Sequence, residues 1–312
     1  MEELLKIVDA HSHLWLRQDA VWRGQRIRTT ANGRSHFLGE EVQMLPPFMT
    51  DGRNTAETFL SNMDYAQVSA AIVVQELIDG PQNDYLEDVQ RRYPDRFRAC
   101  GMCDFAAPDL AAQVRRLAER GLRGMAIPAH RLDAPLNSPE MMAMFRTMQE
   151  LGLFLSITLS DGPEQVAQMR EVIAECPGLR IALGHLCMAV PPWQPVWQDP
   201  DWRAQVRLAC HPNVRIETGG VTWLYHSEFY PYPSAVRAIR EAADLVGMDR
   251  LMWGSDYPRT ITAITYRMSY DFLVRSRELT AEERILLLGE NARRFYGFGA
   301  LVDLPYIKNM SE

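Results

Sequence analysis

Two histidines stand one residue apart close to the N-terminus, in the segment Asp9-Ala10-His11-Ser12-His13. Successive side chains of a β-strand point to opposite faces, so Asp9, His11 and His13 would share one face. Two imidazoles held side by side on a strand can bind a metal ion or polarise a carbonyl group. Taken alone, such a motif can also be a buried structural pair. The later segment Trp253-Gly254-Ser255-Asp256-Tyr257-Pro258 adds a carboxylate and favours the chemical interpretation.

Eight short apolar runs alternate with amphipathic helical stretches along almost the whole chain. This pattern predicts an α/β fold, a single (β/α)8 TIM barrel over residues 1–312. A doubly wound open sheet is the second choice, but no Gly-x-Gly-x-x-Gly follows the first predicted strand. The predicted strands are residues 6–14, 70–77, 97–105, 124–129, 153–160, 179–186, 214–221 and 251–256. The predicted helices are residues 55–66, 84–93, 109–119, 139–151, 163–175 and 234–246, with a C-terminal helix over 281–296 that closes the barrel or covers its base.

Two segments are too long to be plain connections. Residues 15–53, after the first strand, form a long and irregular stretch that interleaves arginines with Trp15, Trp22 and Phe37. We expect this segment to be a lid over the site, with an exposed basic loop as the alternative. Residues 188–202, after the sixth strand, are rich in tryptophan and proline. Such clusters clamp a loop to the body of a protein or make a subunit contact.

Enzymes with a TIM barrel carry their catalytic groups at the carboxyl ends of the strands. His11 and His13 end the first predicted strand, His185 the sixth and Asp256 the eighth. Gly184, next to His185, would let another group approach the backbone closely. Each polar residue alone has an ordinary structural explanation, but such groups are rarely buried without partners. We therefore predict that the three histidines and Asp256 meet in one active site.

Candidate substrate-binding residues follow the other strands. His130 and Arg131 follow the fourth strand, Arg259 the eighth, and Trp223 and Tyr225 the seventh. The planar fork of an arginine matches a carboxylate, and aromatic faces suit a sugar ring or a planar acid. Arg259 is the preferred carboxylate ligand, with a surface ion pair as its alternative. For Trp223 and Tyr225 the alternative is packing under a loop.

The ordered set of motifs resembles the amidohydrolase superfamily, and more closely its amidohydrolase-related (amidohydrolase 2) branch. The set comprises residues 9–13, 184–185, 251–258 and the closing Glu290-Asn291-Ala292-Arg293-Arg294-Phe295-Tyr296, and it spans essentially the whole chain. The resemblance implies that His11 and His13 line the metal or carbonyl position, that His185 contacts substrate or metal, and that Asp256 is the acid/base residue. Members of the branch include sugar-acid lactonases, dicarboxylate-pyrone lactonases and metal-dependent nonoxidative decarboxylases.

Two positions depart from the metal-binding members of that family. Where those relatives usually carry a histidine at the end of the fifth strand, this chain offers only hydroxyls, in Leu155-Ser156-Ile157-Thr158-Leu159-Ser160. Hydroxyls are poor zinc ligands beside imidazole and carboxylate. The fourth strand, residues 124–129, also lacks the lysine that bridges two metals in binuclear relatives. The expected centre is one divalent metal, zinc or manganese, on His11, His13 and Asp256 with His185 nearby, or no metal at all.

The leading hypothesis is a hydrolase that opens a small lactone of a sugar acid or a dicarboxylate. An ester carbonyl is electrophilic enough for a positioned base and hydrogen-bond donors to suffice. Asp256 would take a proton from water and deliver it to the leaving alkoxide, while His11, His13 and His185 polarise the carbonyl or bind the metal. Two alternatives stay open. One is a metal-dependent nonoxidative decarboxylase or hydratase of an aromatic or unsaturated carboxylic acid, and the other is a non-catalytic binding barrel.

Composition limits the partners of the chain. The net charge of -7 argues against a nucleic-acid surface, and the longest clean apolar stretch, residues 151–159, is too short to span a bilayer. The charged start, residues 1–3, fits no signal peptide, and the five scattered cysteines fit reduced thiols in a cytoplasm. Cys100 and Cys103 would be ordinary buried thiols, since positions three apart on a strand face opposite sides. We expect a cytoplasmic enzyme with a small carboxylate or sugar-acid lactone as substrate and no nucleic-acid or membrane partner, and a homo-oligomer stays open.

Overall fold

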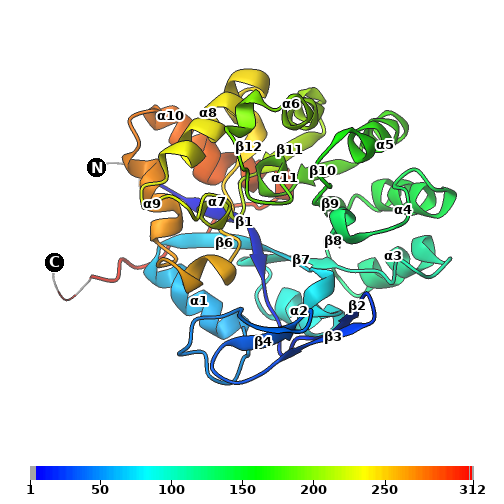
Figure 1. The fold of residues 1–312 in the computed structure, drawn as a ribbon, viewed down its shortest axis with the longest axis horizontal. Coiled ribbons are helices and arrows are strands. Elements are labelled where there is room, and N and C mark those ends of the chain that lie inside the picture. Colours follow the sequence, from blue (N-terminus) through cyan, green and yellow to red (C-terminus); the bar gives the residue numbers. More distant parts are fainter. Residues whose placement is uncertain (1–4, 309, 311–312) are drawn as a thin grey trace.

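Eight parallel strands form a barrel at the centre of the protein (Figure 1). The computed structural model describes residues 5–308 and 310, and the strands follow one another around the barrel in chain order. The first and last strands also meet, because the Ala10 N–H donates to the Trp253 carbonyl and the Asp256 N–H to the His11 carbonyl, both at 2.9 Å. The predicted TIM barrel is therefore confirmed. Its strands are β1 (Ile7–His13), β6 (Val68–Val74), β7 (Phe97–Gly101), β8 (Gly124–Ile127), β9 (Phe154–Ile157), β10 (Arg180–Leu183), β11 (Val214–Glu217) and β12 (Leu251–Met252).

The barrel strands are shorter than their predicted runs, and the difference matters most at the carboxyl ends. β10 stops at Leu183 and β12 at Met252, whereas the predicted strands continue to residues 186 and 256. His185 and Asp256 have φ angles of +53° and +58°, in the left-handed region that an extended strand excludes. Such residues persist only where the surrounding structure enforces the conformation, as at many active sites. Turns at the mouth of the barrel, rather than strand ends, therefore present these two side chains.

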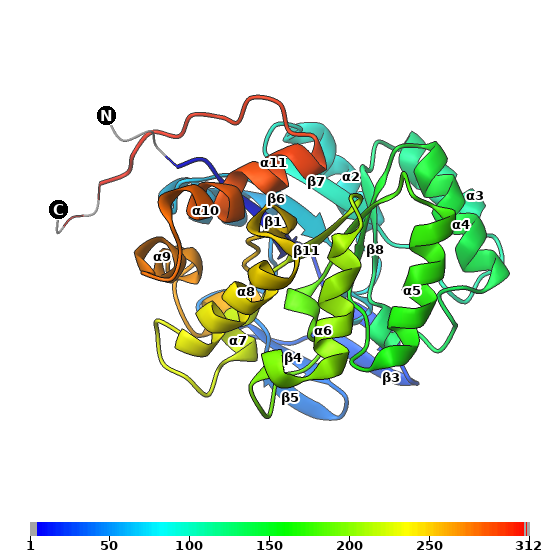
Figure 2. The same ribbon diagram turned by 90° about the horizontal axis from the view of Figure 1, so that it is seen from above.

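Helices cover the outside of the barrel (Figure 2). The six predicted internal helices are present with shifts of a few residues, and α4 begins after Ser138, whose hydroxyl accepts from the Met141 N–H. The predicted C-terminal helix is also present, interrupted by a π-helical turn over Leu286–Glu290. The helices are α1 (Ala56–Tyr65), α2 (Asn83–Arg92), α3 (Leu110–Glu119), α4 (Pro139–Glu150), α5 (Pro163–Glu175), α6 (Pro200–Val206), α7 (Val221–Leu224), α8 (Pro233–Val246), α9 (Met268–Arg275), α10 (Ala281–Ile285) and α11 (Asn291–Tyr296).

The expectation of an irregular loop over residues 15–53 is wrong, because this segment forms a four-stranded antiparallel sheet. Its strands, here called the insertion sheet, are β2 (Asp19–Trp22), β3 (Gln25–Thr29), β4 (Arg34–Phe37) and β5 (Glu40–Gln43), drawn in dark blue in Figure 1. Two-residue turns, Arg23-Gly24 and Leu38-Gly39, join β2 to β3 and β4 to β5, and all four residues have positive φ. Turns of this type match the twist of paired strands, so both hairpins have a local cause.

The tryptophan- and proline-rich segment over residues 188–202 behaves as a clamp at its C-terminal end. Trp202 is buried and its indole N–H donates to the Leu186 carbonyl at 2.8 Å. Trp197 packs against the core, whereas Trp193 is 87% exposed. The clamp interpretation therefore holds for two of the three tryptophans.

The described residues contain no helix with both the length and the apolar character needed to cross a membrane. All five cysteines are free thiols, and Cys100 and Cys103 are buried, as expected. Residues 1–3, on which the expectation of no signal peptide rests, lie outside the described residues.

The closing segment of residues 290–296 fastens the last strand of the barrel. Asn291 is buried, and its side-chain amide donates to the carbonyls of Met248 and Leu251 at 2.8 and 2.7 Å. Two backbone acceptors at the start of β12 thus depend on one side chain. Buried carbonyls that lose their donors carry the full cost of desolvation.

Substituting Asn291→Ala should therefore lower the free energy of unfolding by about 2–3 kcal/mol, since two buried acceptors lose their partner. Urea denaturation followed by circular dichroism measures the change. Asn137→Ala is the matched control, because Asn137 is exposed and its amide bonds only the exposed Glu171, so its effect should stay within about 0.5 kcal/mol. Equal effects of the two substitutions would contradict this role of Asn291.

Candidate active site

A cavity of about 450 Å³ opens at the mouth of the barrel. The ends of the barrel strands form its floor, and the insertion sheet contributes its apolar side. Every site residue predicted from the sequence lines this cavity except Tyr225. The expected meeting of the strand ends in one site is thus present in the structure.

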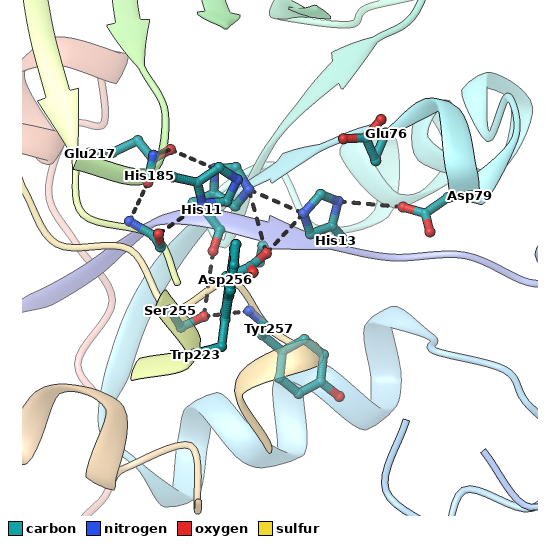
Figure 3. Close-up of polar contacts among 12 residues, drawn as sticks. His11, His13, Glu76, Asp79, His185, Glu217, Trp223, Ser255, Asp256 and Tyr257 are labelled. Atoms are coloured by element: carbon teal, nitrogen blue, oxygen red, sulfur yellow. Dashed lines mark hydrogen bonds and ion pairs between the residues drawn. The ribbon is translucent and has the colours of Figure 1, made fainter. Parts of the chain in front are cut away.

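His11, His13 and Asp256 converge on one point of the cavity floor (Figure 3). The Nε2 atoms of His11 and His13 lie 3.1 Å apart. Asp256 Oδ1 lies 3.2 Å from His13 Nε2 and 3.6 Å from His11 Nε2. Three ligand atoms from the two ends of the chain therefore form a small triangle.

The size of this triangle fits a metal ion. Zinc binds imidazole nitrogen and carboxylate oxygen at about 2.0–2.2 Å, so adjacent ligands of a tetrahedral site lie about 3.3 Å apart. The three observed separations, 3.1, 3.2 and 3.6 Å, bracket this value. Manganese favours oxygen ligands, and Asp256 supplies one beside the two nitrogens. The residues present thus fit one divalent metal ion.

A carboxylate stands behind each of the paired histidines. Glu217 Oε1 lies 2.8 Å from His11 Nδ1, and Asp79 Oδ2 lies 3.5 Å from His13 Nδ1. A carboxylate that accepts from one ring nitrogen fixes the tautomer and leaves the other nitrogen free to bind a metal. Both Nε2 atoms point at the triangle (Figure 3). Glu217 therefore orients His11 through a hydrogen bond, whereas Asp79 faces His13 Nδ1 at ion-pair distance without a hydrogen bond.

The electric field at the triangle favours a cation. Burial alone would lower the pKa of His11, but the charges of Glu217, Asp256 and Asp9 raise it to about 9. Burial alone would raise the pKa of Asp256, but hydrogen bonding to His13 and the nearby imidazoles hold it well below its ordinary value. Asp256 is therefore a carboxylate at neutral pH, and the positive charge next to it can be a proton or a metal ion.

His185 lies beside His11, with ring centroids 4.5 Å apart. Its Nδ1 lies 2.8 Å from the Gly219 carbonyl oxygen, and a carbonyl only accepts, so Nδ1 carries the hydrogen. Burial and the neighbouring His11 lower the pKa of His185, which keeps the ring neutral. Nε2 of His185 is therefore a free acceptor that can take a proton or bind a metal.

Two glycines allow His11 and Glu217 to pack this tightly. A Cβ atom on Gly254 would lie 2.8 Å from His11 Cβ, and one on Gly219 would lie 2.4 Å from Glu217 Oε2. Gly184 is confined in the same way, since its Cβ would meet Thr158 Oγ1 at 2.5 Å. The close approach expected next to His185 is thus present, and the glycines make room for the buried carboxylate.

Trp223 connects Asp256 to a guanidinium group. Its indole N–H donates to Asp256 Oδ2 at 2.5 Å, and the Arg259 guanidinium lies 3.8 Å from the centre of its ring. Arg259 has no acidic ion-pair partner among residues 5–308, and it is exposed at the cavity edge. An arginine that lies over an indole ring without an acidic partner is available to bind a carboxylate.

His130 and Arg131 share a different acidic partner. Arg131 Nε lies 3.0 Å from Glu76 Oε1, and His130 Nε2 lies 3.7 Å from Glu76 Oε2. Burial lowers the pKa of His130 to about 4, so its ring is neutral. The Arg131 guanidinium also lies 4.9 Å from the ring centre of Trp22 on the insertion sheet. Both residues line the cavity, with Arg131 already paired.

Tyr225 lies apart from the cavity. It is 6% exposed, belongs to the hydrophobic core and does not line the cavity, because the short helix α7 turns it inward. Asp9, expected on the same face as the two histidines, is fully buried, does not line the cavity and accepts from Ser255 and Tyr266, and the register of β1 is irregular between Asp9 and Ser12. The hydroxyls of Ser156 and Thr158 do line the cavity, as the fifth predicted strand suggested.

Three acidic residues of the site, Glu76, Asp79 and Glu217, were not expected from the sequence. Each is at or just after the carboxyl end of a barrel strand, as the histidines are. The available signal was a carboxylate that interrupts an apolar strand pattern, most clearly Glu217 in Val214–Glu217. Glu217 orients His11 and Glu76 pairs with Arg131, as carboxylates behind metal ligands and binding residues commonly do.

The family model described as "Amidohydrolase" matches residues 8–298 of the chain. An L-fucono-1,5-lactonase from Burkholderia ambifaria is 26% identical over 306 residues, which covers 93% of this chain and 94% of the relative. Among solved structures, an amidohydrolase from Burkholderia multivorans with bound zinc has a TM-score of 0.70 at 22% identity, over 94% of this chain and 99% of that one.

Two further solved structures are similar in fold. A probable 2-pyrone-4,6-dicarboxylic acid hydrolase from Acinetobacter baumannii, with citric acid bound, has a TM-score of 0.69 at 18% identity and covers 94% of this chain and 100% of its own. A 5-carboxyvanillate decarboxylase from Novosphingobium aromaticivorans, complexed with manganese, has a TM-score of 0.57 at 19% identity and covers 78% and 80%. At 18–22% sequence identity, the similarity to these solved structures shows a shared barrel fold.

Glu217→Gln should weaken zinc binding about 10- to 100-fold, because the neutral amide no longer fixes the tautomer and charge of His11. Competition with a chromophoric chelator measures the affinity. Glu290→Gln is the control, since Glu290 pairs with Arg293 and Arg294 in the closing helix, and its zinc affinity should be unchanged. Unchanged affinity in a folded Glu217→Gln protein would show that Glu217 serves only the fold.

Proposed function

Because this chain belongs to the amidohydrolase family, we propose that its hydrolytic reaction is the opening of a small lactone of a sugar acid or a dicarboxylate. The observation that carries the proposal is the convergence of two imidazoles, one carboxylate and an unpaired arginine on a single cavity. The lactonase and the pyrone hydrolase among the similar proteins support it.

One divalent metal, zinc or manganese, would be held by His11, His13 and Asp256. When bound, it would polarise the lactone carbonyl and lower the pKa of a water molecule. The zinc and manganese in two similar structures support this choice of ions. Glu217 holds the His11 imidazole in the orientation that such a centre requires, and Asp79 places a negative charge beside His13.

The protein side chains would move the protons. Asp256 accepts a proton from the attacking water, whose oxygen forms a bond to the carbonyl carbon. The same carboxyl then gives the proton to the ring oxygen as the carbon–oxygen bond of the ring breaks, which leaves a hydroxy acid. The Trp223 N–H occupies one lone pair of Asp256 Oδ2 and fixes the orientation of the carboxylate, while other lone pairs stay available for the proton.

His185 and Arg259 would position the reactants. The neutral His185 ring offers Nε2 as an acceptor for the attacking water, because its Nδ1 hydrogen is committed to the Gly219 carbonyl. Arg259 would bind a carboxylate of the substrate with its planar fork. His130 and Arg131 border the same space, with Arg131 paired to Glu76.

A metal-dependent decarboxylase or hydratase of an unsaturated acid is the second candidate, supported by the manganese-containing decarboxylase of similar fold. The same triangle of ligands and the same arginine would serve it. The hydroxyl-lined fifth strand disfavours it, since Ser156 and Thr158 replace the imidazole that metal-binding relatives usually have there. Release of carbon dioxide from aromatic and unsaturated acids would identify this chemistry.

Asp256→Asn should lower kcat for lactone opening at least about 100-fold, because the amide can neither accept nor deliver the proton. A pH-indicator assay on a panel of sugar-acid and dicarboxylate lactones measures the rate. Asp249→Asn, on an exposed residue in the turn before β12, should keep the wild-type rate. Near-full turnover in Asp256→Asn would exclude Asp256 as the acid/base residue.

Removing metal from the purified protein with a chelator should abolish lactone opening, and zinc or manganese should restore it, since the triangle fits a Lewis acid. Metal analysis before and after treatment gives the stoichiometry, which should be one ion per chain. Magnesium serves as the control ion, because it prefers all-oxygen sites. If turnover continues after complete metal removal, the metal requirement is wrong, and the imidazoles would stabilise the oxyanion without a metal ion.

A further inference from the structure

The cavity combines a charged floor with an apolar roof. The floor holds the ligand triangle and Arg259, described above. The roof comes from the insertion sheet and its flanking turn and strand ends, through Trp22, Phe37, Leu38, Val42 and Met44. Of the insertion residues between 19 and 44 that line the cavity, only Gln43 is polar. A substrate in this cavity meets polar groups on one side and hydrocarbon on the other.

These roof side chains do not belong to the protein core. The hydrophobic clusters among the described residues contain none of the five, although the same segment sends Ile27 and Ala20 into buried positions. Trp22, Phe37, Val42 and Met44 are half-exposed, and Leu38 is 38% exposed. Apolar surface left facing a cavity is stabilised when an apolar ligand displaces its water.

The roof is fastened to the barrel rather than free to open. Trp22 lies against the Arg131 guanidinium at 4.9 Å, and Glu76 holds that guanidinium from the barrel side. Gln18, just before β2, donates to Asp79 Oδ1 at 2.7 Å, and the Ser35 hydroxyl donates to Gln18 at 2.6 Å. These contacts fasten the insertion sheet to the barrel.

The size of the cavity exceeds what the reacting group needs. A volume of 450 Å³ has room for about fifteen water molecules at about 30 Å³ each. A lactone ring at the triangle would occupy only part of it. Part of the remaining space is bordered by the roof, whose side chains offer a hydroxyl group few hydrogen-bond partners.

We infer that the substrate is an amphiphilic lactone, whose carbonyl end lies at the triangle and whose ring carries an alkyl or aryl substituent packed against the insertion-sheet roof. This inference rests on the proposed lactone opening and narrows it from hydroxyl-rich sugar lactones to lactones with an apolar substituent. The insertion sheet would then select the substituent of the lactone, and the barrel residues would carry out the hydrolysis.

A series of lactones with growing substituents tests the inference. The probes are δ-valerolactone, δ-octalactone and δ-decalactone, which differ only in the alkyl chain on the carbon bonded to the ring oxygen, with glucono-1,5-lactone as the hydroxyl-rich member. For the metal-loaded full-length protein, kcat/KM should rise about two- to fourfold for each added methylene that reaches the roof. It should be lowest for glucono-1,5-lactone. If kcat/KM stays constant or falls as the alkyl chain grows, the inference is wrong.

Matched variants assign the effect to the roof. Phe37→Ala and Val42→Ala should reduce the dependence of kcat/KM on chain length, since both side chains line the cavity. Phe48→Ala and Val21→Ala are the controls, because these residues are 77% and 72% exposed and lie outside the lining. The controls should keep the wild-type dependence. If kcat/KM depends on chain length equally in all four variants, the roof does not bind the substituent.

Binding of the hydroxy acids separates this inference from the proposed reaction. Isothermal titration with 5-hydroxypentanoate, 5-hydroxyoctanoate and 5-hydroxydecanoate requires no turnover, and affinity should rise along the series in wild type and less in Phe37→Ala. If no lactone is opened but affinity still rises, the proposed reaction fails and the apolar recognition stands. If lactones are opened but the affinity for the hydroxy acids does not change along the series, the proposed reaction stands and only the apolar recognition fails.

Discussion

The seam where the first barrel strand meets the segment after the last one is the contact on which the site depends. Asp9 is fully buried there and accepts from the backbone N–H and the hydroxyl of Ser255 and from the Tyr266 hydroxyl. Burial raises the pKa of Asp9 to about 6 although these hydrogen bonds lower it. The seam sets Asp256, one residue beyond Ser255, beside His13, 243 positions earlier in the chain. Without this closure the ligand triangle would not exist.

A layer of carboxylates behind the histidines turns that meeting into a centre for a cation. Glu217 fixes His11, and Asp79 faces the far nitrogen of His13. Asp79 is itself held by Gln18, which belongs to the insertion. Burial raises the pKa of Asp79 to about 6, against the opposing effect of His13. Gln18 therefore joins the insertion to the carboxylate that faces His13.

Much of the fold was accessible from sequence, because it depends on local patterns. Apolar runs and amphipathic stretches alternate strictly, and strand ends of a barrel share one face, which was enough to bring His11, His13, His185 and Asp256 together. The insertion sheet had a local signal as well, in the two X-Gly turns at Arg23-Gly24 and Leu38-Gly39. Its short strands carry mostly polar residues, so no strand periodicity was evident. Tyr225 was misplaced because the short helix α7 turns its side chain into the core.

The sequence by itself determined the barrel and the order in which its chemical groups arrive at the mouth, since secondary structure follows from periodicity and parallel strands end at one edge. Only the tertiary structure decided which atoms meet. The separations in the ligand triangle depend on the left-handed turn at Asp256 and on glycines too close to His11 and Glu217 to bear a side chain. The apolar roof likewise depends on how a separate sheet docks on the barrel. Such contacts join residues far apart in the chain, and no local pattern encodes the distance between them.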